Sequence, residues 1–197
     1  MAFARLVGGL AFLILGVTSS LAQGARQSQY FRDRLTSGGD MVFGRDKAWR
    51  NISSAADAVV RMDPSFALGY VVGITHNGAI WQLVGRGNPG NRRDPTSVRE
   101  VGCSRPVDEK VGRKILALWG KALSSKGETG QAGLDGETFT FSLKGQRAAG
   151  YVWSPDPRYQ PKMYRLAQVS DGMFAACITG KGLDVINRQI DALLRTM

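Results

Sequence analysis

SFALGYVVGITHNGAIWQLVG, residues 65–85, contains two runs of β-branched and aromatic residues on either side of Asn77-Gly78. An Asn-Gly pair between two such runs is the strongest short-range signal for a β-hairpin, because both residues tolerate the positive φ of a type I′ turn. We therefore expect a hairpin here, with Asn77 and Gly78 at the centre of its turn. His76, the only histidine of the chain, is then an exposed residue beside the turn.

Further strands are expected on both sides of a central helix. Residues 98–103 alternate well enough for a short strand that ends at Cys103, and 138–143 alternate strictly between polar and apolar residues. A Lys-Gly-Gln turn then leads into 147–153, which is the partner strand of a second hairpin.

Apolar residues at helical spacing predict three or four helices. The first starts at Asp46, carries Trp49, Ile52, Ala56 and Val59, and stops at Asp63-Pro64. The second has Pro106 in its first turn and an apolar stripe from Val107 to Ala122, weakened by two glycines. A third runs from 163 to 176 with an interruption near 171–172, and the stripe from Leu183 to Met197 predicts the last.

The order of these elements indicates the fold class. Strands and helices do not alternate strictly, so a parallel sheet is not expected. We predict an α+β fold, in which an antiparallel sheet built from hairpins packs against three or four helices and is closed by one disulfide. Residues 46–85 and 107–153 each carry a helix-plus-hairpin pattern, as a duplication would produce, but their residue identity is too thin to infer one.

The first 22 residues have the pattern of an export signal. Arg5 precedes the apolar run 6–17, and Ser20-Leu21-Ala22 matches a small-x-small cleavage site. The run is short for a spanning helix, which needs roughly 20 apolar residues. We expect cleavage after Ala22, a loosely ordered arm over 23–45, and a single domain over 46–197. The mature protein is then periplasmic or secreted and has no transmembrane span.

The two cysteines, Cys103 and Cys177, fit that location. An even number of cysteines in an oxidising compartment indicates a disulfide. A bridge over so long a loop stabilises the fold by about 4 kcal/mol in the chain-entropy treatment.

The basic residues are the main indication of function. The formal net charge is +10, which favours anionic partners. Two groups of cations are candidates, one in the loop around 86–93 and one on the second helix. A solvated helix face with a charged loop would explain the same residues. The candidate anion-binding residues are Arg86, Arg92, Arg93, Lys110, Arg113, Lys114 and Lys121.

Patterns of known catalytic or cofactor sites are missing from the sequence. One histidine and two bridged cysteines do not suffice for a zinc site, and neither a phosphate-binding glycine loop nor a G-x-S-x-G motif occurs. We therefore expect no metal and no cofactor. Because no partner residue for His76 is evident, we interpret it as a turn residue rather than a base.

Two other groups of residues have structural interpretations. Asp135 and Glu137 are read as residues at the entry of a hairpin rather than as a carboxylate pair. Among the tryptophans, Trp49 and Trp119 are expected in the core, whereas Trp81 and Trp153 could lie on either face of a strand.

These observations favour an exported, non-catalytic binding or interaction protein of the bacterial envelope. Its expected partner is an anionic lipid, a polysaccharide or an acidic protein surface, rather than nucleic acid. Two alternatives remain: a small envelope hydrolase with a serine or carboxylate site assembled by the fold, and a structural component of an envelope complex. No pattern in the sequence indicates an oligomeric state.

Overall fold

The computed structural model describes Leu35 and residues 51, 52, 54–64, 69–87, 100–127, 136–152 and 161–197. These residues form six strands and three long helices. In chain order they are β1 (Ala58–Pro64), β2 (Tyr70–Asn77), β3 (Ile80–Gly87), β4 (Val101–Val107), α3 (Glu109–Ser124), β5 (Glu137–Leu143), β6 (Gln146–Val152), α4 (Pro161–Thr179) and α5 (Leu183–Thr196).

All six strands belong to one antiparallel sheet with the order β4-β3-β2-β1-β5-β6. Strand β1 lies near its middle, where Ala58 pairs with Ile74 of β2 on one side and with Leu143 of β5 on the other. The hairpins β2–β3 and β5–β6 therefore flank a strand that precedes both of them. The predicted α+β fold with a hairpin-built antiparallel sheet is confirmed.

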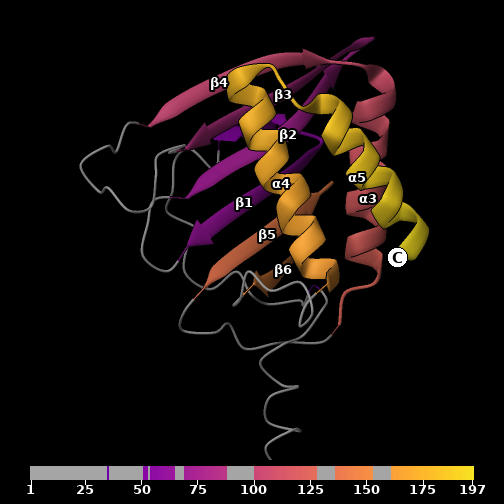
Figure 1. Ribbon diagram of the computed structural model, residues 1–197. Helices are drawn as coiled ribbons and strands as arrows, with labels where there is room; N and C mark the ends of the chain where they lie inside the picture. The colour runs from indigo at the N-terminus through magenta and orange to yellow at the C-terminus, as the bar shows by residue number, and fades with distance from the viewer. Residues whose placement is uncertain are drawn as a thin grey trace, which may run out of the picture.

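Helices α3, α4 and α5 cover one face of this sheet (Figure 1). Both α3 and α4 pack on strands, and α5 packs against both of these helices. Trp119 of α3 is completely buried, its ring meets Phe141 edge to face, and its Nε1 donates a 3.2 Å hydrogen bond to the Val59 carbonyl. The largest fully buried side chains come from both the sheet and the helices: Trp119, Phe139, Phe141, Ile74, Leu83, Ile115, Leu118, Leu123, Met163, Leu166, Met173 and Ile186.

The first predicted helix is wrong at its carboxyl end. Residues 51, 52, 54 and 55 are helical, but strand β1 begins at Ala58 and includes Val59. Val59 and Val71 face away from the main core and form a small cluster with Ile52 and Ala56. The apolar residues of 52–59 thus belong partly to a short helix and partly to strand β1, which follows it. Trp49 lies outside the described residues.

The turn between β2 and β3 differs from the expected type I′ turn by one residue. Asn77 pairs with Ile80, so Gly78 and Ala79 occupy the centre of the turn. Gly78 has φ +59°, whereas Ala79 has no positive φ, a combination typical of type II′. The type I′ pattern occurs instead between β5 and β6, where Lys144 and Gly145 have φ values of 48° and 81°.

The boundary between β4 and α3 also differs from the prediction. Strand β4 continues past Cys103 through Pro106, and α3 begins only at Glu109. Proline is tolerated there because β4 is an edge strand, where one side of the backbone needs no hydrogen bond. Asp108 caps the helix, since its Oδ1 accepts a 2.7 Å hydrogen bond from the backbone N–H of Lys110.

Helix α4 is continuous, although an interruption was expected near 171–172. Asp171 accepts a 2.7 Å hydrogen bond from the Tyr70 hydroxyl, which ties α4 to β2. At Gly172 an added Cβ would lie 3.0 Å from Cγ1 of Ile186, so the small residue allows α5 to pack closely. Tertiary contacts thus explain both residues without a break in the helix.

Candidate anion-binding site

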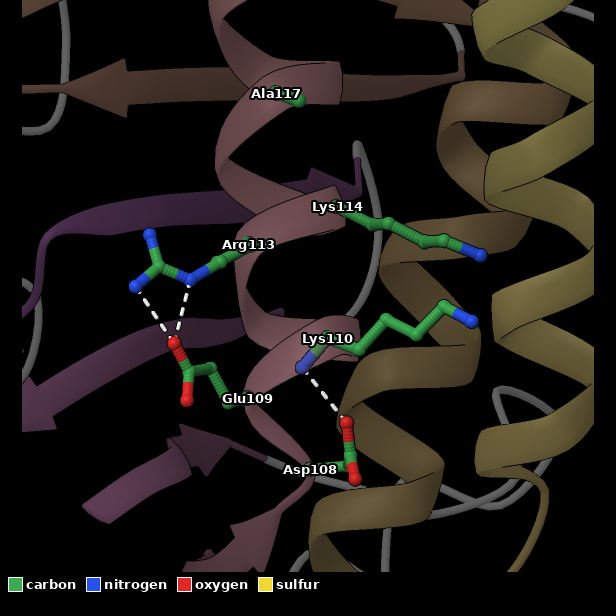
Figure 2. A pocket seen from close by; sticks show the side chains of 6 residues that line it. All are labelled: Asp108, Glu109, Lys110, Arg113, Lys114 and Ala117. Carbon is green, nitrogen blue, oxygen red and sulfur yellow. Dashed lines mark hydrogen bonds and ion pairs between the residues drawn. The ribbon is translucent and has the colours of Figure 1, made fainter. Parts of the chain in front are cut away.

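The amino-terminal half of α3 carries an open depression of about 550 Å³ on the surface. We call it the α3 groove and define it by its lining residues: Asp108, Glu109, Lys110, Arg113, Lys114 and Ala117. Residues three and four apart are neighbours on a helix, so Lys110 lies between Arg113, three residues on, and Lys114, four residues on. The short side chain of Ala117, one turn after Arg113 and Lys114, leaves the space between longer neighbours (Figure 2).

Each cation of the α3 groove has a different environment. The ammonium of Lys110 has no partner in the described part of the chain, although its backbone N–H binds the cap. Arg113 pairs with Glu109 at 2.6 Å, but both side chains are well exposed, at 69% and 50%. Lys114 is only 21% exposed, because its Nζ contacts Asp191 and Asn187 of α5.

Figure 2 shows that Lys110 extends to the same side of α3 as Lys114, whereas Arg113 and Glu109 extend to the other side. An exposed ion pair is worth little, about 0–1 kcal/mol, so an incoming anion can replace Glu109 at Arg113 at small cost. The position at the amino end of α3 adds the positive partial charge of the helix dipole. Lys110 and Arg113 are therefore the cations available to a ligand, and Lys114 links α3 to α5.

The other predicted anion-binding residues do not line the α3 groove. Nζ of Lys121 donates a 2.8 Å hydrogen bond to the Leu194 carbonyl near the end of α5. Arg86 alternates with the buried residues Gly85 and Gly87 of β3, so it lies on the sheet face away from the helices, and it pairs with Glu100. Arg92 and Arg93 lie outside the described residues.

Next to the α3 groove lies a row of stacked side chains at the end of the β2–β3 hairpin. The guanidinium of Arg113 lies 5.8 Å from the ring centroid of Trp81, which is 4% exposed and belongs to the core. His76 stacks on Trp81, with centroids 4.7 Å apart and an interplanar angle of 16°. Trp81 is thus no open platform for bases or sugars, and Trp153 lies outside the described residues.

The expectation that His76 lacks a partner is wrong. Oδ2 of Asp57 lies 2.7 Å from its Nδ1 and also accepts a 2.9 Å hydrogen bond from its backbone N–H. This pair could not be recognised from the sequence, because the helical spacing around Asp57 predicts a helix, whereas Asp57 lies directly before β1. His76 is nevertheless exposed, as expected, with 42% of its side chain accessible.

The cysteines and the acidic residues singled out in the sequence have structural roles where the structure describes them. Cys103 and Cys177 form the predicted disulfide, which joins β4 to α4. Glu137 is the first residue of β5, in line with a hairpin entry, whereas Asp135 is outside the described residues. Within the described ranges, no group of three or more histidine, cysteine, aspartate or glutamate residues is arranged to hold a metal ion.

Comparison of the chain with protein-family models, with curated proteins and with solved structures finds no match. The assignment of a site therefore rests on the chemistry of the residues themselves. Among the described helices none is both long and apolar enough to cross a membrane.

Proposed function

We propose that this protein is an exported binding module whose α3 groove takes an anionic partner of the bacterial envelope. The observation that carries the proposal is the placement of Lys110, Arg113 and Lys114 around one open depression at the amino end of a helix. The chemistry shared by its candidate partners is an exposed phosphate or carboxylate, as on lipid headgroups, acidic polysaccharides and acidic protein surfaces. Binding of this kind requires no catalytic group in the groove.

The electrostatics of the α3 groove support recognition with little reorganisation. The Lys110 ammonium has no partner among the described residues, so an anion that binds it breaks no contact there. At Arg113 an anion replaces the exposed carboxylate of Glu109. Lys114 keeps its hydrogen bonds to Asn187 and Asp191 of α5. Because Lys110 and Arg113 are solvent-exposed, salt should screen the interaction over a Debye length of about 8–10 Å at physiological ionic strength.

The proposed location rests on two features. The disulfide between Cys103 and Cys177 fits an oxidising compartment. The first 22 residues carry the pattern of a cleavable export signal. An anionic partner in the envelope is consistent with the net charge of the chain, which is +10.

Retention on anionic lipid vesicles and on heparin, at about 50 and about 300 mM salt, tests the proposal. The test variant is Lys110→Ala/Arg113→Ala. Its matched control is Lys162→Ala/Arg165→Ala, which removes two exposed cations at the same positions of a different helix, the second and fifth residues of α4. We expect salt-sensitive retention that the first pair of substitutions abolishes and the second preserves.

Two results would overturn this function. Equal losses in both double variants would mean that net charge alone causes retention, without a role for the α3 groove. Absence of retention on both matrices at low salt would show that the basic residues serve solubility, and the anionic partner would be wrong.

A further inference from the structure

His76 is held in one orientation by two side chains, Asp57 and Trp81. The Asp57 carboxylate accepts hydrogen bonds from the backbone N–H and lies 2.7 Å from Nδ1, and the indole of Trp81 stacks on the ring. Trp81 is itself fixed, because it is buried against Gly112 of α3. An exposed imidazole on a hairpin normally rotates freely, whereas this one has a defined plane and a defined hydrogen-bond partner.

The contact with Asp57 also determines which ring nitrogen is reactive. A carboxylate can only accept, so in the neutral ring Nδ1 carries the proton and Nε2 carries the lone pair. Within the described part of the chain Nε2 has no hydrogen-bond partner. The lone pair of an oriented imidazole is thus available to a molecule from solvent, and the Asp57 carboxylate can stabilise the positive charge that forms when Nε2 reacts.

A purely structural role would explain only part of this geometry. Asp57 precedes β1 and its backbone N–H donates to the Ile74 carbonyl, so its side chain can serve to hold the backbone of His76 at the end of the sheet. That role needs a hydrogen-bond acceptor but no charge, and any side chain at position 76 would satisfy it. The contact with Nδ1 and the stacked Trp81 are additional, and both act on the imidazole.

We propose that Asp57 and His76 form a nucleophilic acyl-transfer site that hydrolyses small activated acyl esters. The proposal is independent of the α3 groove, since neither residue lines that depression. It differs from a serine site as well: in the described residues no serine hydroxyl hydrogen-bonds to His76, so the imidazole is the group that touches the substrate. Asp57 acts through His76 and is a positioning residue.

The reaction proceeds in two balanced steps. Nε2 attacks the carbonyl carbon of the ester, a C–N bond forms, the C–O bond to the leaving group breaks, and the leaving group departs as an anion with the electron pair. The acyl-imidazolium keeps its Nδ1 proton toward Asp57. Water then adds to the acyl carbon, the C–N bond breaks with return of its electron pair to Nε2, and the carboxylic acid and one proton are released to solvent.

Turnover of p-nitrophenyl acetate tests the site, with N-acetylhistidine as the measure of an unassisted imidazole. Each of the eight lysines and the amino terminus can be acylated once without turnover, so only product beyond nine equivalents per chain identifies a recycling nucleophile. We expect the second-order rate constant per imidazole to exceed that of N-acetylhistidine by about tenfold or more. This increase is smaller than the rate enhancement that a positioned acid or base typically supplies in an enzyme. We expect His76→Ala to remove this activity.

Asp57→Asn separates activation from structural support. Asparagine retains an oxygen that accepts the backbone N–H of His76 but removes the negative charge, and we expect a loss of about threefold or more in rate per folded molecule. Asp184→Asn, which removes an exposed carboxylate on α5, is the control and should leave the rate unchanged. A thermal unfolding curve for each variant shows that folded protein is compared.

Three outcomes would overturn the proposal: turnover no faster than N-acetylhistidine, activity retained in His76→Ala, or a change below threefold in folded Asp57→Asn. A measurement on the unmodified protein covers the case in which Asp57→Asn does not fold. Diethyl pyrocarbonate acylates imidazole, and because His76 is the only histidine, the ultraviolet absorbance of the ethoxyformylated imidazole reports this residue alone. Ethoxyformylation faster than that of N-acetylhistidine supports the proposal, and an equal or slower rate contradicts it.

Discussion

Gly112 of α3 lies against the Trp81 indole, so close that an added Cβ at residue 112 would be 2.2 Å from Cε3 of the ring. This contact joins the helix that carries the α3 groove to the hairpin that carries His76. It fixes Trp81, on which both His76 and Arg113 lie. A glycine that lowers helix propensity is therefore required for the arrangement of both candidate sites.

Gly112→Ala should destabilise the protein. The methyl group has no room beside a buried tryptophan, and overpacking of this kind costs about 1–3 kcal/mol. Gly120→Ala in the same helix is the control, since its Cβ would lie 3.6 Å from Leu143 in ordinary contact. There alanine should gain up to about 1 kcal/mol of helix propensity. Urea unfolding of both variants gives the comparison, and equal shifts in the two midpoints would contradict the assigned packing.

The periodic patterns of the sequence predicted most of the fold. Strict alternation identified β5, and the apolar stripe from Leu183 identified α5, in which Ile186, Ile190 and Leu193 are buried. The errors occur where tertiary contacts override a local pattern. Val59 follows a helical spacing but pairs in the sheet, and Pro106 resembles a helix start but lies in an edge strand.

The candidate sites were less predictable than the fold. Regular helical spacing places Lys110 next to both Arg113 and Lys114, but the pairing of Arg113 with Glu109 and of Lys114 with α5 depends on the packed structure. The pair Asp57–His76 has a sequence separation of 19 and forms through the register of β1 and β2. A register that depends on sheet packing cannot be derived from the residues near His76 alone.

The β2–β3 turn gives a prediction that distinguishes the observed register from a type I′ turn. Gly78→Ala should lower the free energy of unfolding by about 1–2 kcal/mol, because φ of Gly78 is +59° and an alanine rarely adopts this conformation. A clash does not contribute, because no atom lies within 4 Å of the added Cβ. Asn77→Ala should change stability by less than about 0.5 kcal/mol, because Asn77 has no positive φ. Thermal unfolding measures both. Comparable losses at the two positions would indicate that Asn77 and Gly78 form the centre of the turn.

The disulfide should account for a large share of the stability. It joins residues separated by 74 positions and ties the edge strand β4 to α4, where Arg105 also donates hydrogen bonds to the carbonyls of Cys177 and Ile178. Replacement of both cysteines by serine should lower the free energy of unfolding by about 4 kcal/mol. Guanidinium unfolding of the double variant tests this value. A loss below about 1 kcal/mol would mean that the packing around Cys177 suffices without the bond.

Lys114 should matter for stability more than an exposed cation does. Its partly buried ammonium connects α3 to Asn187 and Asp191 of α5, so Lys114→Ala should cost about 1–2 kcal/mol. Arg188→Ala removes one partner of an ion pair whose side chains are 70% and 72% exposed, and the expected loss is about 0–0.5 kcal/mol. Equal losses of the two variants in urea unfolding would mean that Lys114 stabilises the protein no more than an exposed cation does, and its role as a link between α3 and α5 would be wrong.

Lys110→Glu should separate binding from stability. Because the ammonium has no partner among the described residues, the substitution should change the free energy of unfolding by less than about 0.5 kcal/mol. It places a carboxylate at the mouth of the α3 groove, where it repels an anion and competes for Arg113, so retention on anionic vesicles at low salt should fall at least about tenfold. Lys162→Glu, which makes the same charge change at the equivalent position of α4, should retain most of the binding. If both reversals weaken retention equally, the vesicles respond to the net charge of the protein and the α3 groove has no special role.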